Sequence, residues 1–137
     1  MRLTSLADYA VVMMAAAARR PLGAQLSATL LAAETGVPLP TAQKLTGRLA
    51  AAGLLDTARG TGGGFRLARD AAEISLADIV EAVEGPIQMT SCLDAERHDC
   101  ALESCCQVRP HMGIVNGAVR GALAAVRLDS LAQREVA

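Results

Sequence analysis

The feature that most constrains this 137-residue chain is one segment, residues 92–106, which contains all four of its cysteines. The same segment holds His98 and four carboxylates. Neither a helical nor a strand period runs through it, so packing against a core gives it little reason to become ordered. A bound metal centre is the leading explanation for its order, because clustered thiolates are typical metal ligands.

The apolar side chains of this sequence are mostly small. Hydrophobic residues make up 52% of the chain but aromatic residues only 1%, namely Tyr9 and Phe65. Alanine, leucine and valine therefore form the core, and small side chains allow close helix packing but bury little area each. We expect one domain that completes its core by association with a second copy.

Charge is unevenly distributed along the chain, although the net charge of −1 neither favours nor excludes nucleic acid. Between residues 70 and 106 the charged residues are acidic, apart from Arg97. The middle of the chain is basic, and its cations are Lys44, Arg48, Arg59, Arg66 and Arg69. A basic patch on a near-neutral protein is sufficient to bind phosphates.

The apolar run at residues 9–18 resembles the centre of a secretion signal, but its flanks do not fit one. Asp8 precedes the run, there is no basic stretch beyond Arg2, and about ten apolar residues are too few to cross a bilayer. We therefore expect a cytoplasmic protein. In that compartment, clustered cysteines are more often metal ligands or redox groups than disulfides.

Three helices are predicted in the first half of the chain. The first covers residues 6–19, where apolar side chains, Tyr9 among them, recur at three- and four-residue spacing. The second covers residues 27–35, with Ser27 as its N-cap and Ala33 among its inward-facing residues. The third covers residues 40–52 and begins at a proline. The short connection between the second and third helices is typical of a helix-turn-helix.

The next elements extend this unit to a winged helix. Residues 54–59 and 64–67 predict two strands joined by a glycine-rich turn. A small hairpin directly after a helix-turn-helix is the winged-helix arrangement. We therefore predict a mainly α fold, a winged helix-turn-helix with a small β-hairpin wing and a long C-terminal dimerisation helix.

Two further helices are predicted after the wing. Ser75 and Asp78 indicate a capping box at the start of a fourth helix. The last helix runs from Pro110 to about residue 127, and the tail after Asp129 is expected to fray. Its apolar stripe and its three glycines spaced by four favour contact with a helix of a second subunit, the alternative being packing onto its own domain. The stripe consists of Ile114, Val115, Ala118, Val119, Ala122, Leu123 and Val126.

Several motifs over residues 1–132 resemble those of the IscR-type winged-helix transcription regulators, which carry iron–sulfur clusters. They stand in the family's order and are Met1-Arg-Leu-Thr4, Asp8-Tyr-Ala10, Ala51-Ala-Gly-Leu54, residues 59–65 (RGTGGGF), residues 67–70 (LARD), residues 74–86 (ISLADIVEAVEGP) and the cysteines in the pattern Cys-x7-Cys-x5-Cys. The chain looks most like the branch that regulates the SUF cluster-assembly operon. NsrR-like nitric oxide sensors and RirA-like iron regulators are close relatives.

We accordingly divide the chain into four parts. A winged helix-turn-helix DNA-binding domain covers residues 1–86, and a cluster-binding loop covers residues 87–110. A dimerisation helix follows at residues 111–132, and residues 133–137 form a tail.

The resemblance implies an iron–sulfur cluster with Cys92, Cys100 and Cys106 as ligands. IscR has a histidine ligand at the position of Arg109, and arginine cannot ligate a metal. In NsrR-like members, an aspartate from the first helix of the other subunit completes a 4Fe–4S cluster, and Asp8 stands at that position. A 4Fe–4S cluster with Asp8 as its fourth ligand is thus favoured, and a 2Fe–2S cluster is the alternative.

Two other residues of the cysteine segment are alternative ligands. Cys105 could replace Cys106 after a small shift of the loop, or could serve as a spare redox thiol. His98 is a further alternative ligand. A zinc site is disfavoured, because the sequence has no C-x2-C pair of the kind found in structural zinc sites.

The third predicted helix is the candidate recognition helix for the major groove of operator DNA. Its exposed polar positions would be Thr41, Gln43 and Lys44, with Arg48 better placed for the phosphate backbone. From the wing, Arg59 would enter a narrow minor groove, and Gly62 and Gly63 would allow a close approach of the backbone.

These features together predict a homodimeric DNA-binding transcription regulator and not an enzyme. It would be a repressor that senses iron–sulfur cluster status and controls SUF-type cluster assembly or iron and oxidative-stress genes. One alternative is a nitric oxide sensor of the NsrR type. Another, from a different class, is a thiol redox enzyme or cluster carrier that uses Cys105 or Cys106.

Overall fold

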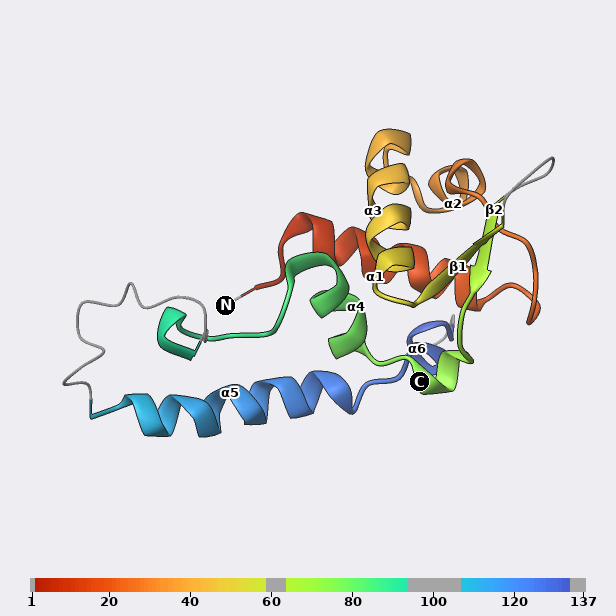
Figure 1. The fold of residues 1–137 in the computed structure, drawn as a ribbon. Helices are drawn as coiled ribbons and strands as arrows, with labels where there is room; N and C mark the ends of the chain where they lie inside the picture. The colour runs from red at the N-terminus through yellow and green to blue at the C-terminus, as the bar shows by residue number, and fades with distance from the viewer. Residues whose placement is uncertain (1, 59–63, 94–106, 134–137) are drawn as a thin grey trace.

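The computed structural model describes residues 2–58, 64–93 and 107–133. A group of short helices and a two-stranded hairpin forms the main body, and one longer helix lies along its edge and extends beyond it (Figure 1). The mainly α prediction and the hairpin are confirmed. In chain order the elements are α1 (Ser5–Ala18), α2 (Ala28–Thr35), α3 (Leu39–Ala51), β1 (Leu55–Ala58), β2 (Gly64–Leu67), η1 (Ala71–Glu73), α4 (Leu76–Glu84), η2 (Ser91–Leu93), α5 (Arg109–Ala124) and α6 (Leu128–Leu131).

Helix α1 lies at the centre of the core. Thr4 caps its start, where the hydroxyl accepts a hydrogen bond of 3.2 Å from the backbone N–H of Ala7. Met13 and Met14 are only 1% exposed, and most of the neighbouring alanines are buried with them. Tyr9, although part of the apolar pattern of this helix, is 36% exposed.

Helices α2 and α3 form the predicted helix-turn-helix. The Ser27 hydroxyl caps α2 by accepting a hydrogen bond of 3.0 Å from the N–H of Leu30. Gly36 ends α2 at φ +83°, a left-handed conformation that favours glycine. Only Leu31 of α2 is fully buried, and Ala33 is exposed rather than inward-facing as predicted. Ala33 follows Leu31 by two residues, which is more than half a helical turn. The two side chains therefore point to nearly opposite sides of α2, and only Leu31 meets the core.

The wing is an antiparallel pair in which Leu55 lies opposite Leu67 and Ala58 lies opposite Gly64. Its inner face is anchored by Phe65, which exchanges two backbone hydrogen bonds with Leu26, at 2.7 and 2.8 Å. A Cβ atom at position 64 would lie 2.2 Å from the carbonyl oxygen of Leu26, so a glycine is required there. The wing is therefore held against the segment that leads into α2.

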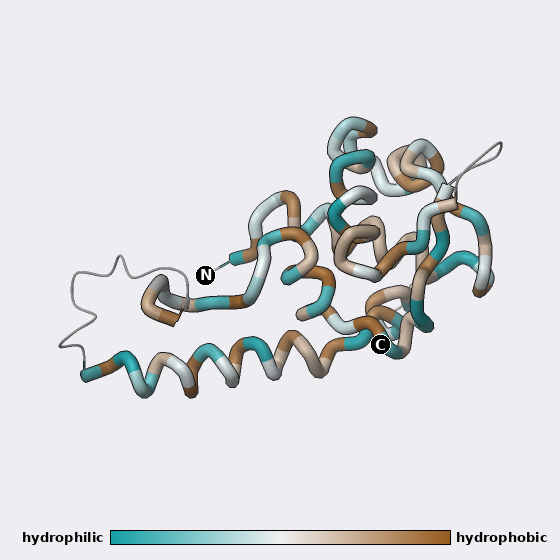
Figure 2. The backbone as a smooth tube through the Cα atoms, in the orientation of Figure 1, coloured by the Kyte–Doolittle hydropathy of each residue, from teal (hydrophilic) through white to brown (hydrophobic). Residues whose placement is uncertain are grey.

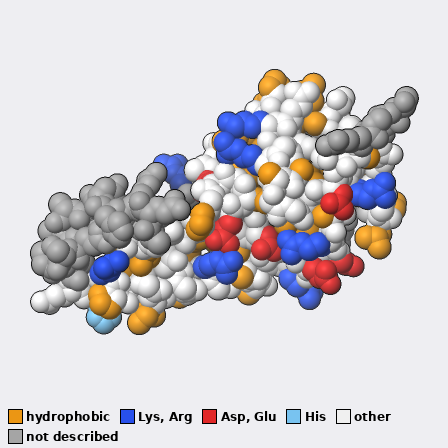
Figure 3. Space-filling model, viewed as in Figure 1, with side chains coloured by type: hydrophobic (Ala, Val, Ile, Leu, Met, Phe, Trp, Pro, Cys, Tyr) orange, Lys and Arg blue, Asp and Glu red, His pale blue; other side chains and the backbone are white. Residues whose placement is uncertain are grey.

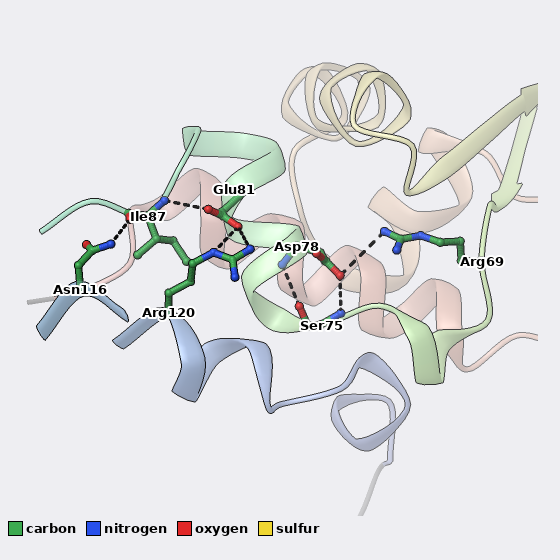
Figure 4. A network of polar contacts seen from close by, with 7 residues as sticks. All are labelled: Arg69, Ser75, Asp78, Glu81, Ile87, Asn116 and Arg120. Carbon is green, nitrogen blue, oxygen red and sulfur yellow. Dashed lines mark hydrogen bonds and ion pairs between the residues drawn. The ribbon is translucent and has the colours of Figure 1, made fainter. Parts of the chain in front are cut away.

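Helix α4 begins with the predicted capping box. The Ser75 hydroxyl accepts a hydrogen bond from the N–H of Asp78 at 3.1 Å, and the Asp78 carboxylate accepts one from the N–H of Ser75 at 2.9 Å. Arg69 lies 3.9 Å from the same carboxylate (Figure 4). Gly85, at φ +83°, ends the helix.

The C-terminal part differs from the single helix and frayed tail predicted from sequence. Helix α5 ends at Ala124, and the short helix α6 returns to the main body, where Leu128 is fully buried. Two backbone hydrogen bonds of 2.8 Å hold this return, from the N–H of Leu128 to the carbonyl of Ile74 and from the N–H of Leu76 to the carbonyl of Val126. The Arg19 side chain also donates to the carbonyl of Ala132 at 2.9 Å. Within the described residues, the helix α6 and its contacts therefore continue past Asp129, where fraying was expected.

No residue of α5 is fully buried, and its predicted apolar stripe is divided between two directions. Val119 and Leu123 face the main body, where they line an open hollow of about 750 Å³ together with Val80 of α4. Ile114 and Val115 are 73% and 43% exposed. Figure 2 shows these hydrophobic turns along a helix at the edge of the molecule. The sequence left two alternatives for this stripe, contact with a second subunit or packing onto its own domain. In the structure, one part of the stripe packs onto its own domain and another part faces outwards.

We predict that Leu128→Ala lowers the free energy of unfolding by about 2–5 kcal/mol, because it leaves a cavity in a fully buried site. Chemical denaturation followed by far-ultraviolet circular dichroism measures this change. Leu22→Ala is the matched control, since Leu22 is 83% exposed and should change stability little. Equal effects of the two substitutions would show that α6 is not part of the core.

Candidate nucleic-acid interface and cysteine segment

Helix α3 presents a polar face opposite its buried one. Ala42, Leu45 and Leu49 are fully buried, and the intervening Gln43 and Lys44 are exposed. Thr41 is half-buried. Basic side chains lie beside α3 on the face shown in Figure 3. The core contacts of α3 therefore leave Gln43 and Lys44 directed outwards, as a recognition helix requires.

Arg48 of α3 connects this helix to α4. Its side chain is half-buried, and Nη1 donates a hydrogen bond of 2.8 Å to the carbonyl of Val83 in the last turn of α4. The last carbonyls of a helix lack partners within the helix, so a guanidinium there satisfies one of them and interacts favourably with the helix dipole. Arg48 thus holds α3 against α4, and the phosphate contact predicted for it from the sequence stays a prediction.

The predicted DNA contacts of the wing tip fall on Arg59, Gly62 and Gly63, which lie outside the described residues. The two strands that carry the tip are described up to Ala58 and from Gly64. Asp56 and Arg66 lie opposite each other on these strands, and both are exposed.

Cys92 is the one cysteine within the described residues, and its thiol forms no disulfide. It lies half-buried in the short helix η2, with its sulfur 3.1 Å from the hydroxyl oxygen of Thr90. Arg109, the first residue of α5, donates to the carbonyl of Cys92 at 3.4 Å. Arg109 therefore contacts the backbone of the cysteine segment instead of supplying a ligand to a metal.

The other proposed ligands are placed as follows. Cys100 and Cys106, and the alternatives Cys105 and His98, lie outside the described residues. Asp8 is exposed in the first turns of α1. Within the described part of the chain, no three cysteine, histidine or carboxylate side chains come together to form a metal site.

The structure also shows a polar cluster that the sequence did not indicate, formed by Glu81, Asn116 and Arg120 (Figure 4). The Glu81 carboxylate of α4 accepts hydrogen bonds from Nε and Nη2 of Arg120 in α5, at 3.1 and 2.7 Å. It also accepts one from the backbone N–H of Ile87 at 3.0 Å. We call these three side chains the α4–α5 junction. The available sequence signal is weak: Asn116 and Arg120 are four positions apart in residues 112–124, which are otherwise apolar or glycine.

Asn116 supplies the other half of the junction. Its amide nitrogen donates to the carbonyl of Ile87 at 2.9 Å, and its amide oxygen accepts from the N–H of Met89 at 2.8 Å. One side chain of α5 therefore binds the backbone of the segment between α4 and Cys92 at two alternate residues.

The ion pair in the junction alters the pKa of both partners. The hydrogen bond from Arg120 is the main cause that lowers the pKa of the Glu81 carboxyl below its ordinary 4.5, and partial burial opposes it. The same hydrogen bond raises the pKa of Arg120. A lowered pKa in the folded state means that the charged carboxylate contributes stability above its unfolded pKa, and that this contribution is lost as the pH falls through the folded pKa.

We predict that wild-type protein is more stable than Glu81→Gln at pH 7 by less than about 1 kcal/mol, because the ion pair is partly exposed, and that this small difference shrinks as the pH falls below about 4.5. Glutamine keeps the shape and an acceptor oxygen but loses the charge. Urea denaturation of both proteins at pH 7 and at pH 3 measures the difference. A difference that is the same at both pH values would contradict the assigned ion pair.

No helix within residues 2–58, 64–93 and 107–133 is both long enough and apolar enough to cross a membrane.

The helix-turn-helix, the hairpin wing and the outward face of α3 define a winged-helix, DNA-binding transcription regulator. Residues 3–134 match the Rrf2 family, which is described as "Iron-dependent Transcriptional regulator". The chain belongs to this family. Members of the family regulate transcription and are not enzymes.

Three similar proteins illustrate the range of the family. Protein aau3 of Rhizobium meliloti is 38% identical over 124 residues, which cover 90% of this chain and 75% of that protein. The transcriptional regulator NsrR of Bacillus subtilis is 32% identical over 111 residues, 80% of this chain and 75% of that protein. IscR of Photorhabdus laumondii is 29% identical over 135 residues, 98% of this chain and 81% of that protein.

Solved structures agree with the predicted fold. The oxidized form of CymR from Staphylococcus aureus superposes with a TM-score of 0.71 at 26% identity, and the match covers 100% of both chains. The winged-helix prediction and the resemblance to IscR and NsrR are thereby confirmed.

Proposed function

We propose that this regulator is a repressor whose affinity for operator DNA follows the state of an iron–sulfur cluster bound in the cysteine segment. The observation that carries the proposal is the position of Cys92. Its thiol is free, and the segment that leads to it is hydrogen-bonded to both α4 and α5. A change at this cysteine is thus mechanically linked to the unit that bears the recognition helix.

The proposed ligands are the thiolates of Cys92, Cys100 and Cys106 and the carboxylate of Asp8 from a second copy. When bound, the cluster would supply an oxidant-, iron- or nitric oxide-sensitive link between these side chains. The residues described are compatible with this role, because Cys92 is not in a disulfide and Asp8 is exposed near the start of α1. Arg109 donates to the backbone of Cys92, and this favours a fourth ligand from elsewhere over one at position 109.

We propose that the second copy binds along α5. Ile114 and Val115 are exposed apolar side chains on this helix, and an exposed apolar stripe is typical of a protein interface. A Cβ atom added at Gly113, Gly117 or Gly121 would meet no described atom of another element within 4 Å, so a partner backbone can come close along that side. A two-fold dimer would give two recognition helices, as palindromic operators require.

In the proposed complex with DNA, α3 enters the major groove. Gln43 and Lys44 are exposed on its outer face, where glutamine can read adenine and lysine can bind guanine or phosphate. Thr41 and Arg48 flank these positions, and Arg59 with Gly62 and Gly63 would contact the minor groove from the wing. A protein with this role works where the chromosome lies, in the cytoplasm.

The regulated genes would be those of SUF-type cluster assembly or of iron and oxidative stress. A nitric oxide sensor of the NsrR type is the second candidate function. The presence of Asp8 in α1 and of an arginine at position 109 favours it, since both fit the NsrR-like ligand set better than the IscR-like set. A thiol redox or cluster-carrier role of Cys105 or Cys106 has no such support, because the family consists of transcription regulators.

The central test compares cluster-loaded and cluster-free protein. We expect their dissociation constants for the DNA upstream of the chain's own gene to differ by about tenfold or more, equivalent to a coupling free energy of about 1.4 kcal/mol. Anaerobic gel-shift titration measures both constants, and the visible absorbance of the sample reports the cluster content. Equal affinities for every tested operator would overturn the sensing function while leaving the DNA-binding fold intact.

The proposed fourth ligand has its own test. Asp8→Ala should make the cluster dissociate faster in air, because one iron loses its protein ligand, and the decay of visible absorbance measures the rate. Asp56→Ala is the matched control, since Asp56 is also an exposed carboxylate but lies on the wing. Identical decay rates of Asp8→Ala and wild-type protein would remove Asp8 from the ligand set.

A further inference from the structure

We infer that the α4–α5 junction is the device that couples the cysteine segment to the recognition helix. In this inference, Glu81, Asn116 and Arg120 are positioning residues that transmit the state of Cys92 to α3 and that bind neither metal nor DNA. The inference rests on the proposed function, because it names the route by which the cluster would regulate DNA binding.

The first step of the route runs from Cys92 to α5. Residues 85–90 lie between α4 and η2 and belong to no helix or strand. Asn116 binds this connection through the carbonyl of Ile87 and the N–H of Met89, as a neighbouring β-strand would. Met89 is three residues before Cys92, so a displacement of the cysteine is passed to Asn116 over a very short length of chain.

The second step runs from the connection to α4. Ile87 donates its N–H to the Glu81 carboxylate at 3.0 Å, and Arg120 binds the same carboxylate through two nitrogens. Both Arg120 nitrogens donate to Oε1 and the Ile87 N–H donates to Oε2, so the two carboxylate oxygens are engaged in different directions by charge-assisted and backbone hydrogen bonds. Ile87 is therefore held on both sides, by α4 through its N–H and by α5 through its carbonyl (Figure 4).

The third step runs from α4 to the DNA-binding surface. Val83, two residues after Glu81, accepts the hydrogen bond of 2.8 Å from Arg48 of α3. Arg48 lies one helical turn after Lys44, which is exposed on the proposed recognition face. In addition, Glu84 accepts a hydrogen bond from Thr4, the N-cap of α1. A rotation of the last turn of α4 would therefore move α3 relative to α1.

The junction connects the cysteine segment to α4 and α5, but it adds little to the free energy of folding. The side chains of Arg120 and Glu81 are 49% and 22% exposed, and partly exposed ion pairs add little to the free energy of folding. Without the junction, the N–H and carbonyl of Ile87 and the N–H of Met89 would bind water, and the connection would lose its fixed geometry while the core remained folded. This separation makes the inference testable.

The test uses Asn116→Ala and Arg120→Ala in the full chain. For each protein, anaerobic gel shifts give the ratio of operator dissociation constants of the cluster-loaded and cluster-free forms. We expect both substitutions to move this ratio towards one by about 2- to 30-fold, while the cluster absorbance and the midpoint of chemical denaturation stay close to the wild-type values. In the cluster-free proteins, the amide of Met89 should exchange hydrogen faster in Asn116→Ala than in wild type.

Arg127→Ala is the matched control. Arg127 is also an exposed arginine of the C-terminal part, but it pairs locally with Asp129 at 3.2 Å and is outside the route. It should keep the wild-type ratio.

The possible outcomes are distinct. If wild-type protein shows a ratio of one, the proposed sensing function fails. If wild type shows a large ratio that both junction variants retain, the sensing function stands and the coupling route is overturned. If both variants fail to fold or to take up the cluster, the junction is a structural or ligand-supporting element, which also contradicts the inference.

Discussion

The structure depends on the close packing of other elements around α1. Helix α1 is built largely from alanine and methionine, and helices α2, α3, α4 and α6 as well as strand β2 contact it. Small side chains allow these helices to approach closely, and methionine fills the remaining irregular space. The same packing sets the direction of α3 and places the last turn of α4 within reach of Arg48. The packing around α1 therefore determines two features: the outward face of α3, and the contact of α3 with α4, the helix that precedes the cysteine segment.

Local sequence signals predicted the DNA-binding unit well. The caps at Ser27 and Ser75 and the hairpin after α3 depend on residues within a few positions of one another, so their chemistry can be read directly. Ala33 was misplaced, and Tyr9 is exposed within an apolar pattern, because apolar character alone does not tell which side of a helix meets the core. A helix rich in alanine has little contrast between its faces.

The contacts that tie the cysteine segment and the C-terminal helices to this unit could not be predicted in the same way. Glu81 and Arg120 are 39 residues apart, and Arg48 and Val83 are 35 apart, so no local pattern marks either pair. Leu128 follows the apparent end of the last helix, and only its burial against the N-terminal elements shows its role. The cluster ligands are a different case. Their assignment came from the resemblance to a family, and among them the structure describes only Cys92 and Asp8.

The return of α6 to the core has a consequence for how the chain is made. Leu128 lies in the hydrophobic core that surrounds α1 and Leu131 packs against it, although about forty residues separate them from the end of α4. A nascent chain on the ribosome can form its helix-turn-helix and wing early, but it cannot close that core until α6 has emerged. The cysteine segment leaves the ribosome before this closure. The cysteines therefore become accessible to ligands while the core around α1 is still incomplete.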